Sequence, residues 1–527
     1  MKPGEIAHNV SRGAFYLAVE KGAALVSGIA YFALLLRWLG PTKYGIMTLA
    51  LSFAGLATTA TGNFEMFLER YAAEYQARGT LHVLRRAQWM ALWIKTGLGV
   101  LASVILVILA PTLAHQFDTP ELAWLLPPLT GIVMFDGFST TGRATLFGLQ
   151  RFRPLSLVSV AFHVVKTVMV GLMWWAGQGL LALAIGFALL TALQGLIVSG
   201  LAFWMLRDAR EPAPEATAPD PRPTLLRPMF AYCMPLLGAR AAFLSGQNLG
   251  KIVLGKLFDA THLGYFSFAF QTVERFIELF YTVPYSLLPS LTYLVAREER
   301  ARLRDIFDQA FRLIQVAACA LSFVLFVFAH EITLLVGGPS FEPAIPVVRI
   351  MALVPIARTA QQPLTMLFQA MRRPGTVLSL AILKFGTELS CYFLLVPSLT
   401  LIGAGIANLA GAALSFVAAL ALLGVMMPEG AGERARTVFT SVALLVPMLA
   451  LALTIDRHVA VPVAIALRLL LAPVALLGVF ALGLVNRYDL VKLSSVSLSL
   501  RVLRVSRDWV VSGADRVARA FEPRSVP

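Results

Sequence analysis

The chain has 527 residues, of which 58% are hydrophobic and only 14% are charged. A soluble globular domain carries about 25% charged residues, so this composition argues against a soluble enzyme or binding module and indicates a polytopic membrane protein. The formal net charge is +15. In a soluble protein that excess would suggest nucleic-acid binding, but here the positive-inside rule accounts for most of it. The three cysteines lie in apolar segments and indicate neither a disulfide framework nor a metal site.

Long apolar stretches predict an all-α fold of about 14 transmembrane helices. Two lobes of six helices each are expected, followed by two extra C-terminal helices. The expected helices span residues 14–38, 44–68, 88–113, 122–148, 155–176, 180–206, 229–256, 263–293, 313–336, 344–370, 376–397, 402–427, 437–455 and 459–485.

Arginine-rich loops alternate along the chain with short loops that are nearly free of cations, such as 115–120 and 259–262. The positive-inside rule therefore places both termini in the cytoplasm. A Pro/Ala/Glu-rich stretch after the sixth helix is typical of a flexible linker. The expected parts are an N-lobe (1–206), a cytoplasmic linker (207–228), a C-lobe (229–427), two further helices (428–485) and a cytoplasmic tail (486–527).

The tail combines apolar residues every seven positions, at Leu503, Val510 and Val517, with intervening arginines. This pattern predicts a basic amphipathic helix on the anionic inner leaflet. Contact with a cytoplasmic partner is the alternative.

The two halves of the chain resemble each other. Residues 39–45 (LGPTKYG) correspond to 258–264 (FDATHLG). Residues 146–147 (LF) followed by 150–154 (QRFRP) resemble 367–368 (LF) followed by 371–374 (MRRP), with a lysine in the next helix of each half. Because six is an even number of helices, both halves would insert the same way up, related by a pseudo-two-fold axis along the membrane normal. Chance similarity between apolar segments is the alternative explanation.

Basic side chains interrupt the apolar stretches. Each one would cost about 2.5–3.5 kcal/mol at a bilayer centre, so they cannot all face lipid. A water-filled cationic cavity is expected, and such a cavity suits an anionic cargo. The cations are Lys21, Lys95, Arg143, Lys166, Arg240, Lys251, Arg275, Arg349, Arg358, Lys384 and Arg468.

The run from Arg37 to Gly45 (RWLGPTKYG) and the later Arg70–Glu74 (RYAAE) resemble the opening signature of polysaccharide-export flippases. These belong to the multidrug/oligosaccharidyl-lipid/polysaccharide exporter superfamily. Glu65 and Glu69 are more acidic than that pattern. The resemblance implies a V-shaped, two-lobed bundle that alternates between inward-open and outward-open states.

The resemblance also implies an activity. Such a protein would carry a polyprenyl-pyrophosphate-linked oligosaccharide from the inner to the outer leaflet of a bacterial cytoplasmic membrane. Membrane lipids would surround it, and a glycan polymerase and glycosyltransferases are possible partners. No cofactor, metal or nucleic acid is expected, although coupling to H⁺ or Na⁺ is possible.

Cations in a central cavity would replace the lost hydration of the pyrophosphate. The candidates are Lys21, Lys95, Lys166, Arg240, Lys251, Arg349, Arg358 and Lys384. Carboxylates within the expected helices are candidates for binding a coupling ion: Glu20, Asp136, Glu274, Glu278 and Glu388.

For each of these residues, ion pairing within the protein is an alternative role. Lys384 and Glu388 are four residues apart, which allows an internal pair, and Glu274, Arg275 and Glu278 could form a small network. Arg37, Lys256 and Arg468 lie near helix ends and are expected to snorkel.

Three other functions remain open. A lipid II flippase of peptidoglycan synthesis shares the 14 helices and the cationic cavity. A drug/cation antiporter is disfavoured by its usual 12 helices and its cationic cargo. A membrane glycosyltransferase or ligase would need larger outer loops than the short ones present here.

Overall fold

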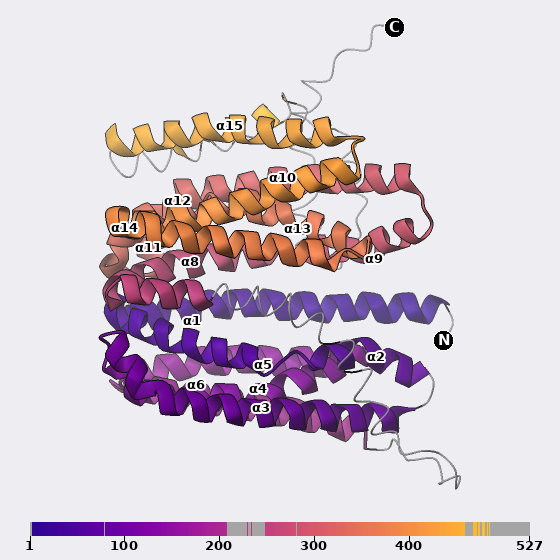
Figure 1. Ribbon diagram of the computed structural model, residues 1–527, viewed down its shortest axis with the longest axis vertical. Helices are drawn as coiled ribbons and strands as arrows, with labels where there is room; N and C mark the ends of the chain where they lie inside the picture. The colour runs from indigo at the N-terminus through magenta and orange to yellow at the C-terminus, as the bar shows by residue number, and fades with distance from the viewer. Residues whose placement is uncertain are drawn as a thin grey trace, which may run out of the picture. The chain divides into compact units, whose positions relative to one another are not determined.

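The computed structural model describes residues 3–77, 80–207, 229, 233, 248–280 and 282–458, with single positions between 467 and 484. All regular structure in these ranges is helical (Figure 1), which confirms the predicted all-α membrane fold. Eight described helices are long and apolar enough to cross a membrane, or nine if one bent pair counts as a single span. The total of 14 stays a prediction. Arg240, most of the linker and the tail 486–527 lie outside the described residues.

The chain forms two compact units. Unit 1 comprises Met1–Ser267 and Leu334–Glu342, and unit 2 comprises Phe268–Thr333 and Pro343–Pro527. The lobe boundaries expected from the sequence stay predictions.

Unit 1 is built from long helices, in which each segment satisfies its own backbone hydrogen bonds within a bilayer. Glycines let neighbours approach closely: Gly142 of α4 faces the backbone of Ser199 in α6, and Gly99 of α3 faces the carbonyl of Val133 in α4. Small residues at such contacts are typical of membrane helix packing. The helices are α1 (Pro3–Ala60), α2 (Glu65–Ala77), α3 (Leu81–Gln116), α4 (Glu121–Gly148), α5 (Phe152–Trp175) and α6 (Leu180–Met205).

Helix α1 is broken at Gly40, which has a φ of 66° and is followed by Pro41. The sequence predicts a division at this point, and it is confirmed. The expected helix 44–68 is wrong at its C-terminal end, however, because α1 stops at Ala60 and α2 begins at Glu65. Gly62 adopts a φ of 82°, and the Thr61 hydroxyl donates to the carbonyl of Thr58 at 2.8 Å. The turn therefore satisfies a carbonyl that the ending helix leaves open.

The break in α1 meets the start of α8 (Ala260–Phe280) in a reciprocal contact within unit 1. A methyl group on Gly45 would overlap the carbonyl of Ala260, and one on Gly264 would overlap the carbonyl of Pro41. The hydroxyl oxygens of Thr42 and Thr261 lie 2.9 Å apart, 219 residues apart in sequence. The same offset relates Gly45 to Gly264, as expected of a local two-fold axis, and this supports the internal repeat here.

Asp259 caps the start of α8. Its Oδ1 accepts hydrogen bonds from the backbone N–H of His262 at 2.7 Å and pairs with the imidazole Nδ1 at 2.6 Å. Partial burial alone would raise the pKa of Asp259, but the hydrogen bonds with His262 outweigh it and hold that pKa below its ordinary value.

Unit 2 contains the rest of α8 and the helices that follow. The expected helix 313–336 is interrupted, since α10 starts earlier and ends before Phe328. The expected helix 344–370 is a pair bent by 44°. The division expected between 397 and 402 is confirmed by the non-helical Thr400 in α14. The elements are α9 (Thr282–Ala296), α10 (Arg300–Val327), α11 (Ala329–Val336, which ends in unit 1), the short η1 (Pro339–Ala344, which begins in unit 1), α12 (Ile345–Met351), α13 (Val354–Ala370), α14 (Pro374–Met426) and α15 (Ala431–His458).

Candidate functional site

Lys95 lies at the centre of a buried charge cluster in unit 1. Its side chain is 2% exposed, and its Nζ lies 2.9 Å from Oε2 of Glu65 and 3.0 Å from Oδ2 of Asp136. It also donates to the Thr140 hydroxyl at 2.8 Å, and Gly137 leaves room for its Cβ. One ammonium thus faces two carboxylates, and these three side chains together carry a formal charge of −1.

Glu20 forms a second cluster in unit 1. Its Oε1 accepts from Nη2 of Arg143 at 3.1 Å, and its Oε2 accepts from the Ser156 hydroxyl at 3.1 Å. Arg143 also donates to the hydroxyl of Ser159 at 3.3 Å. Glu20 is buried, whereas the Arg143 side chain is 44% exposed, so Arg143 is the more accessible member of this pair.

Lys166 contacts aromatic rings. Its Nζ lies 4.3 Å from the ring centre of Tyr31 and 5.1 Å from that of Phe187, close enough for cation–π attraction. Lys251 lies in the helical segment 248–257 and is buried. Lys21 belongs to α1, but its side chain lies outside the described part of the chain, as does Arg240.

A buried ion pair links α13 to α8 in unit 2. Arg358 of α13 donates to Glu274 of α8, and both residues are buried. Glu274 thus pairs across helices rather than within the expected network, and Glu278 is exposed. Removing one partner of a buried pair leaves an uncompensated charge, which costs about 3–5 kcal/mol.

Lys384 and Glu388 pair within α14, with 2.8 Å between Nζ and Oε1. The internal pair that the four-residue spacing allows is therefore confirmed. The amide of Asn408, on the second arm of the same helix, donates to Glu388 at 3.3 Å. Gly411 lies so close that a methyl group there would overlap the Glu388 side chain. The pair therefore also joins the two arms of α14.

Arg349 of α12 is half-buried, and its guanidinium carbon lies 6.0 Å from the ring centre of Phe326. Arg468 does not snorkel as expected, because it is buried and its Nη1 lies 2.5 Å from Oε1 of Glu331. Arg37 donates to the carbonyl of Leu335 at 2.6 Å.

Sequence reasoning missed several members of these clusters. Glu65 is an unusual acid in the sequence signature, and a carboxylate in an apolar stretch is the kind of residue that indicates a buried partner. Glu331 follows His330 in a segment that is otherwise apolar. The hydroxyls of Thr140 and Ser156 carry no comparable signal, since Ser and Thr are common in membrane helices.

The family comparison decides the classification. A family model described as "Polysaccharide biosynthesis protein" matches residues 34–346, more than half of the chain. The chain belongs to this family. The resemblance to polysaccharide-export flippases is thereby confirmed.

Two curated relatives from Bacillus subtilis (strain 168) are distant. Teichuronic acid biosynthesis protein TuaB is 22% identical over 281 residues, which cover 51% of this chain and 54% of TuaB. The chain thus spans about half the length of that relative. Stage V sporulation protein B is 21% identical over 443 residues, which cover 79% of this chain and 84% of that protein.

Solved structures share the fold at low identity. An inward-facing multidrug resistance MATE family transporter of the MOP superfamily aligns with a TM-score of 0.60 at 15% identity, covering 80% of this chain and 96% of that one. The lipid II flippase MurJ in its inward closed conformation aligns with a TM-score of 0.57 at 14% identity, covering 87% of this chain and 97% of that one. The fold is therefore that of membrane transporters.

Proposed function

We propose that this protein is a flippase that carries a polyprenyl-pyrophosphate-linked oligosaccharide from the inner to the outer leaflet of a bacterial cytoplasmic membrane. The observation that carries the proposal is the set of buried charges in apolar helices, within a polysaccharide biosynthesis family and a transporter fold. Charged groups in such helices are costly, and they either pair with one another or line a polar pathway.

The pairing of these charges divides them into two groups. Lys95, Arg358 and Lys384 hold carboxylates, so their first role is to fix helices. Lys166 and Arg349 contact aromatic rings, and the Arg143 side chain is partly exposed. These three cations are candidates for contacting the pyrophosphate, because ammonium and guanidinium groups bind phosphate oxygens. Lys21, Arg240 and Lys251 remain candidates from their positions.

The Lys95 cluster is our candidate for ion coupling. Two carboxylates face one ammonium there, so a bound H⁺ or Na⁺ would balance the charge of these three side chains. Asp136, whose side chain is 21% exposed against 5% for Glu65, is the member that an ion can reach.

Reconstituted vesicles test the proposal. A fluorescent polyprenyl-pyrophosphate oligosaccharide is placed in both leaflets, and an enzyme or quencher outside measures how much becomes accessible. The proposal predicts protein-dependent flipping that Arg349→Gln reduces at unchanged expression and insertion. Flipping of lipid II alone would instead favour the peptidoglycan alternative, and absence of flipping with either lipid would refute the proposal.

A further inference from the structure

One face of α3 in unit 1 carries an arginine, two tryptophans and a glycine at four-residue spacing. These are Arg85, Trp89, Trp93 and Gly97, which lie along one side of the helix and are all exposed. The two indole rings stack with their centres 6.2 Å apart, and Trp93 is 65% exposed. The same face continues with exposed aliphatic side chains at Leu101, Val104 and Ile108. Because α3 is apolar enough to cross a membrane, this face contacts lipid.

Helix α6 shows the same order of residues from its C-terminal end. Trp204 and Gly200 are exposed and lie four residues apart. The ring centre of Phe203 lies 4.5 Å from that of Trp89, so this end of α6 lies beside the N-terminal end of α3. Within the described part of the chain, a Cβ atom at Gly97 or Gly200 would meet no other heavy atom within 4 Å. Both helices therefore lack side-chain bulk just beyond their tryptophans.

Arginines outnumber acidic residues at this end of unit 1, which the sequence predicts to be cytoplasmic. From residue 66 to residue 210, the arginines on that side are Arg70, Arg78, Arg85, Arg86, Arg151, Arg153, Arg207 and Arg210, and the acids are Glu69, Glu74 and Asp208. The exposed Arg85 side chain forms no ion pair or hydrogen bond among the residues that the structure describes. The excess of positive charge attracts an anion to this surface.

The spacing along α3 matches the layers of one bilayer leaflet. A helix rises about 1.5 Å per residue, so Trp89 lies roughly 6 Å and Trp93 roughly 12 Å beyond Arg85. The headgroup layer of a bilayer is about 5–8 Å thick. With Arg85 at the level of the phosphates, Trp89 lies at the interface, where indole rings are favoured. Trp93 and Gly97 then lie beside the first methylene groups of the acyl chains.

We propose that this end of α3 and α6 binds one anionic phospholipid of the inner leaflet. Arg85 binds the phosphate, because a guanidinium matches two phosphate oxygens at once. An acyl chain lies against Trp93 and over the surface that Gly97 and Gly200 leave open. The surplus of arginines favours a headgroup of net negative charge over a zwitterionic one.

The cargo of the proposed flippase shares this phosphate chemistry. Its oligosaccharide headgroup must pass through the transport pathway, however, whereas a phospholipid headgroup stays at the membrane surface where Arg85 lies. The site also uses none of the buried charges assigned to transport. A phospholipid is therefore the occupant that suits an exposed face of two membrane-spanning helices.

Native mass spectrometry of the purified full-length protein tests the proposal. Phosphatidylglycerol and phosphatidylcholine are titrated into wild type, Arg85→Gln and a control variant. Arg85 is exposed, so Arg85→Gln should fold. The proposal predicts that wild type prefers phosphatidylglycerol and that Arg85→Gln binds it roughly tenfold more weakly, since a hydrogen-bonded charge pair is lost.

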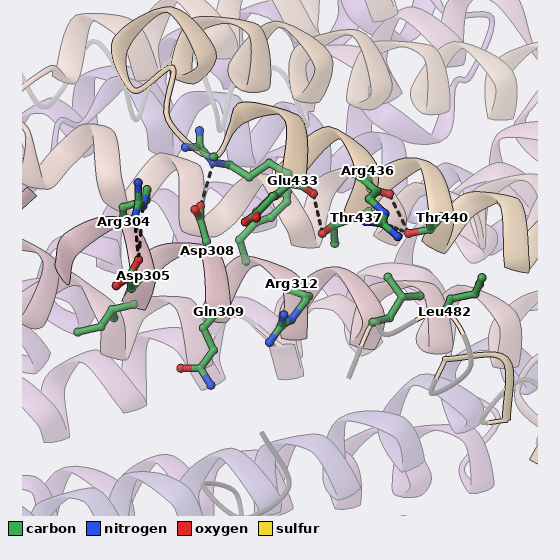
Figure 2. A pocket seen from close by; sticks show the side chains of 15 residues that line it. Arg304, Asp305, Asp308, Gln309, Arg312, Glu433, Arg436, Thr437, Thr440 and Leu482 are labelled. Carbon is green, nitrogen blue, oxygen red and sulfur yellow. Dashed lines mark hydrogen bonds and ion pairs between the residues drawn. The ribbon is translucent and has the colours of Figure 1, made fainter. Parts of the chain in front are cut away.

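Arg436→Gln is the matched control. Arg436 is an exposed arginine that lines a polar cavity of about 930 Å³ between α10 and α15 in unit 2 (Figure 2). The charges around that cavity balance: the arginines are Arg304, Arg312, Arg434 and Arg436, and the carboxylates are Asp305, Asp308, Glu433 and Glu429, the last 2.9 Å from Arg304. The control removes the same charge from the same predicted side of the membrane and should bind phosphatidylglycerol as wild type does.

A second readout locates the lipid. In vesicles, phosphatidylglycerol with brominated acyl chains should quench the tryptophan fluorescence more than brominated phosphatidylcholine, and Trp93→Leu and Arg85→Gln should each reduce that difference. Polyprenyl pyrophosphate is added as a competitor in the mass spectrometry. Equal binding of phosphatidylglycerol by wild type and Arg85→Gln, an equal loss in Arg436→Gln, equal binding of the two phospholipids, an unchanged quenching difference, or displacement by equimolar polyprenyl pyrophosphate would each overturn the proposal.

Discussion

The hydroxyl oxygens of Thr42 and Thr261 lie 2.9 Å apart although 219 residues separate them in the chain. They occupy corresponding positions in the two sequence segments that resemble each other, 39–45 and 258–264. Gly45 and Gly264 flank this contact and each faces a backbone carbonyl of the other segment. The closeness therefore depends on two residues without a Cβ atom.

Bulk at this contact should impair transport. Gly45→Val or Gly264→Val would push the two segments apart, since the new Cβ overlaps a carbonyl oxygen. We expect loss of glycan export with the protein still inserted, measured as surface polysaccharide and membrane-fraction protein. The matched control is Gly171→Ala on α5, where no heavy atom lies within 4 Å. Full export by both valine variants would show that the contact is dispensable.

The Lys95 cluster predicts an asymmetry between its members. Lys95→Met removes the buried ammonium that faces Glu65 and Asp136 and should cost about 3–5 kcal/mol of stability, visible as a lower melting temperature in detergent. Asp136→Asn keeps the Lys95–Glu65 pair and should lower the melting temperature much less. If Asp136→Asn lowered the melting temperature more than Lys95→Met, Lys95 would not be held by both acids.

Asp136→Asn also tests coupling. If the cluster binds the coupling ion, the variant should flip lipid at the same rate with and without a proton or sodium gradient, whereas wild type responds to one of them. A response equal to that of wild type would remove Asp136 from this role.

Arg358 and Glu274 predict a rescue. Arg358→Glu or Glu274→Arg alone places two like charges together in a buried site and should lower the yield of folded protein. The exchanged double variant restores opposite charges and should recover most of it, measured by monodisperse yield on size exclusion. If the double variant did not recover, the loss of folded protein would be due to other groups around the site and not to this pair.

The sequence predicted the local features well, because they depend on neighbours in the chain. The break at Gly40 and Pro41, the division near Thr400 and the Lys384–Glu388 pair all follow from residues within four positions of each other. The partners of Lys95 and Arg468 lie on other helices. Helical periodicity does not report which helices pack together, so those pairs could not be assigned from one sequence.

One measurement tests the central claim most directly. Thr42→Cys/Thr261→Cys, made in a background with Cys233, Cys319 and Cys391 changed to Ser, is reconstituted with a labelled polyprenyl-pyrophosphate oligosaccharide. A flippase that works by alternating access should move this lipid when reduced, stop when the disulfide closes, and recover with reductant. Movement at equal rates in the oxidised and reduced states, or none above protein-free vesicles in the reduced state, would contradict the account.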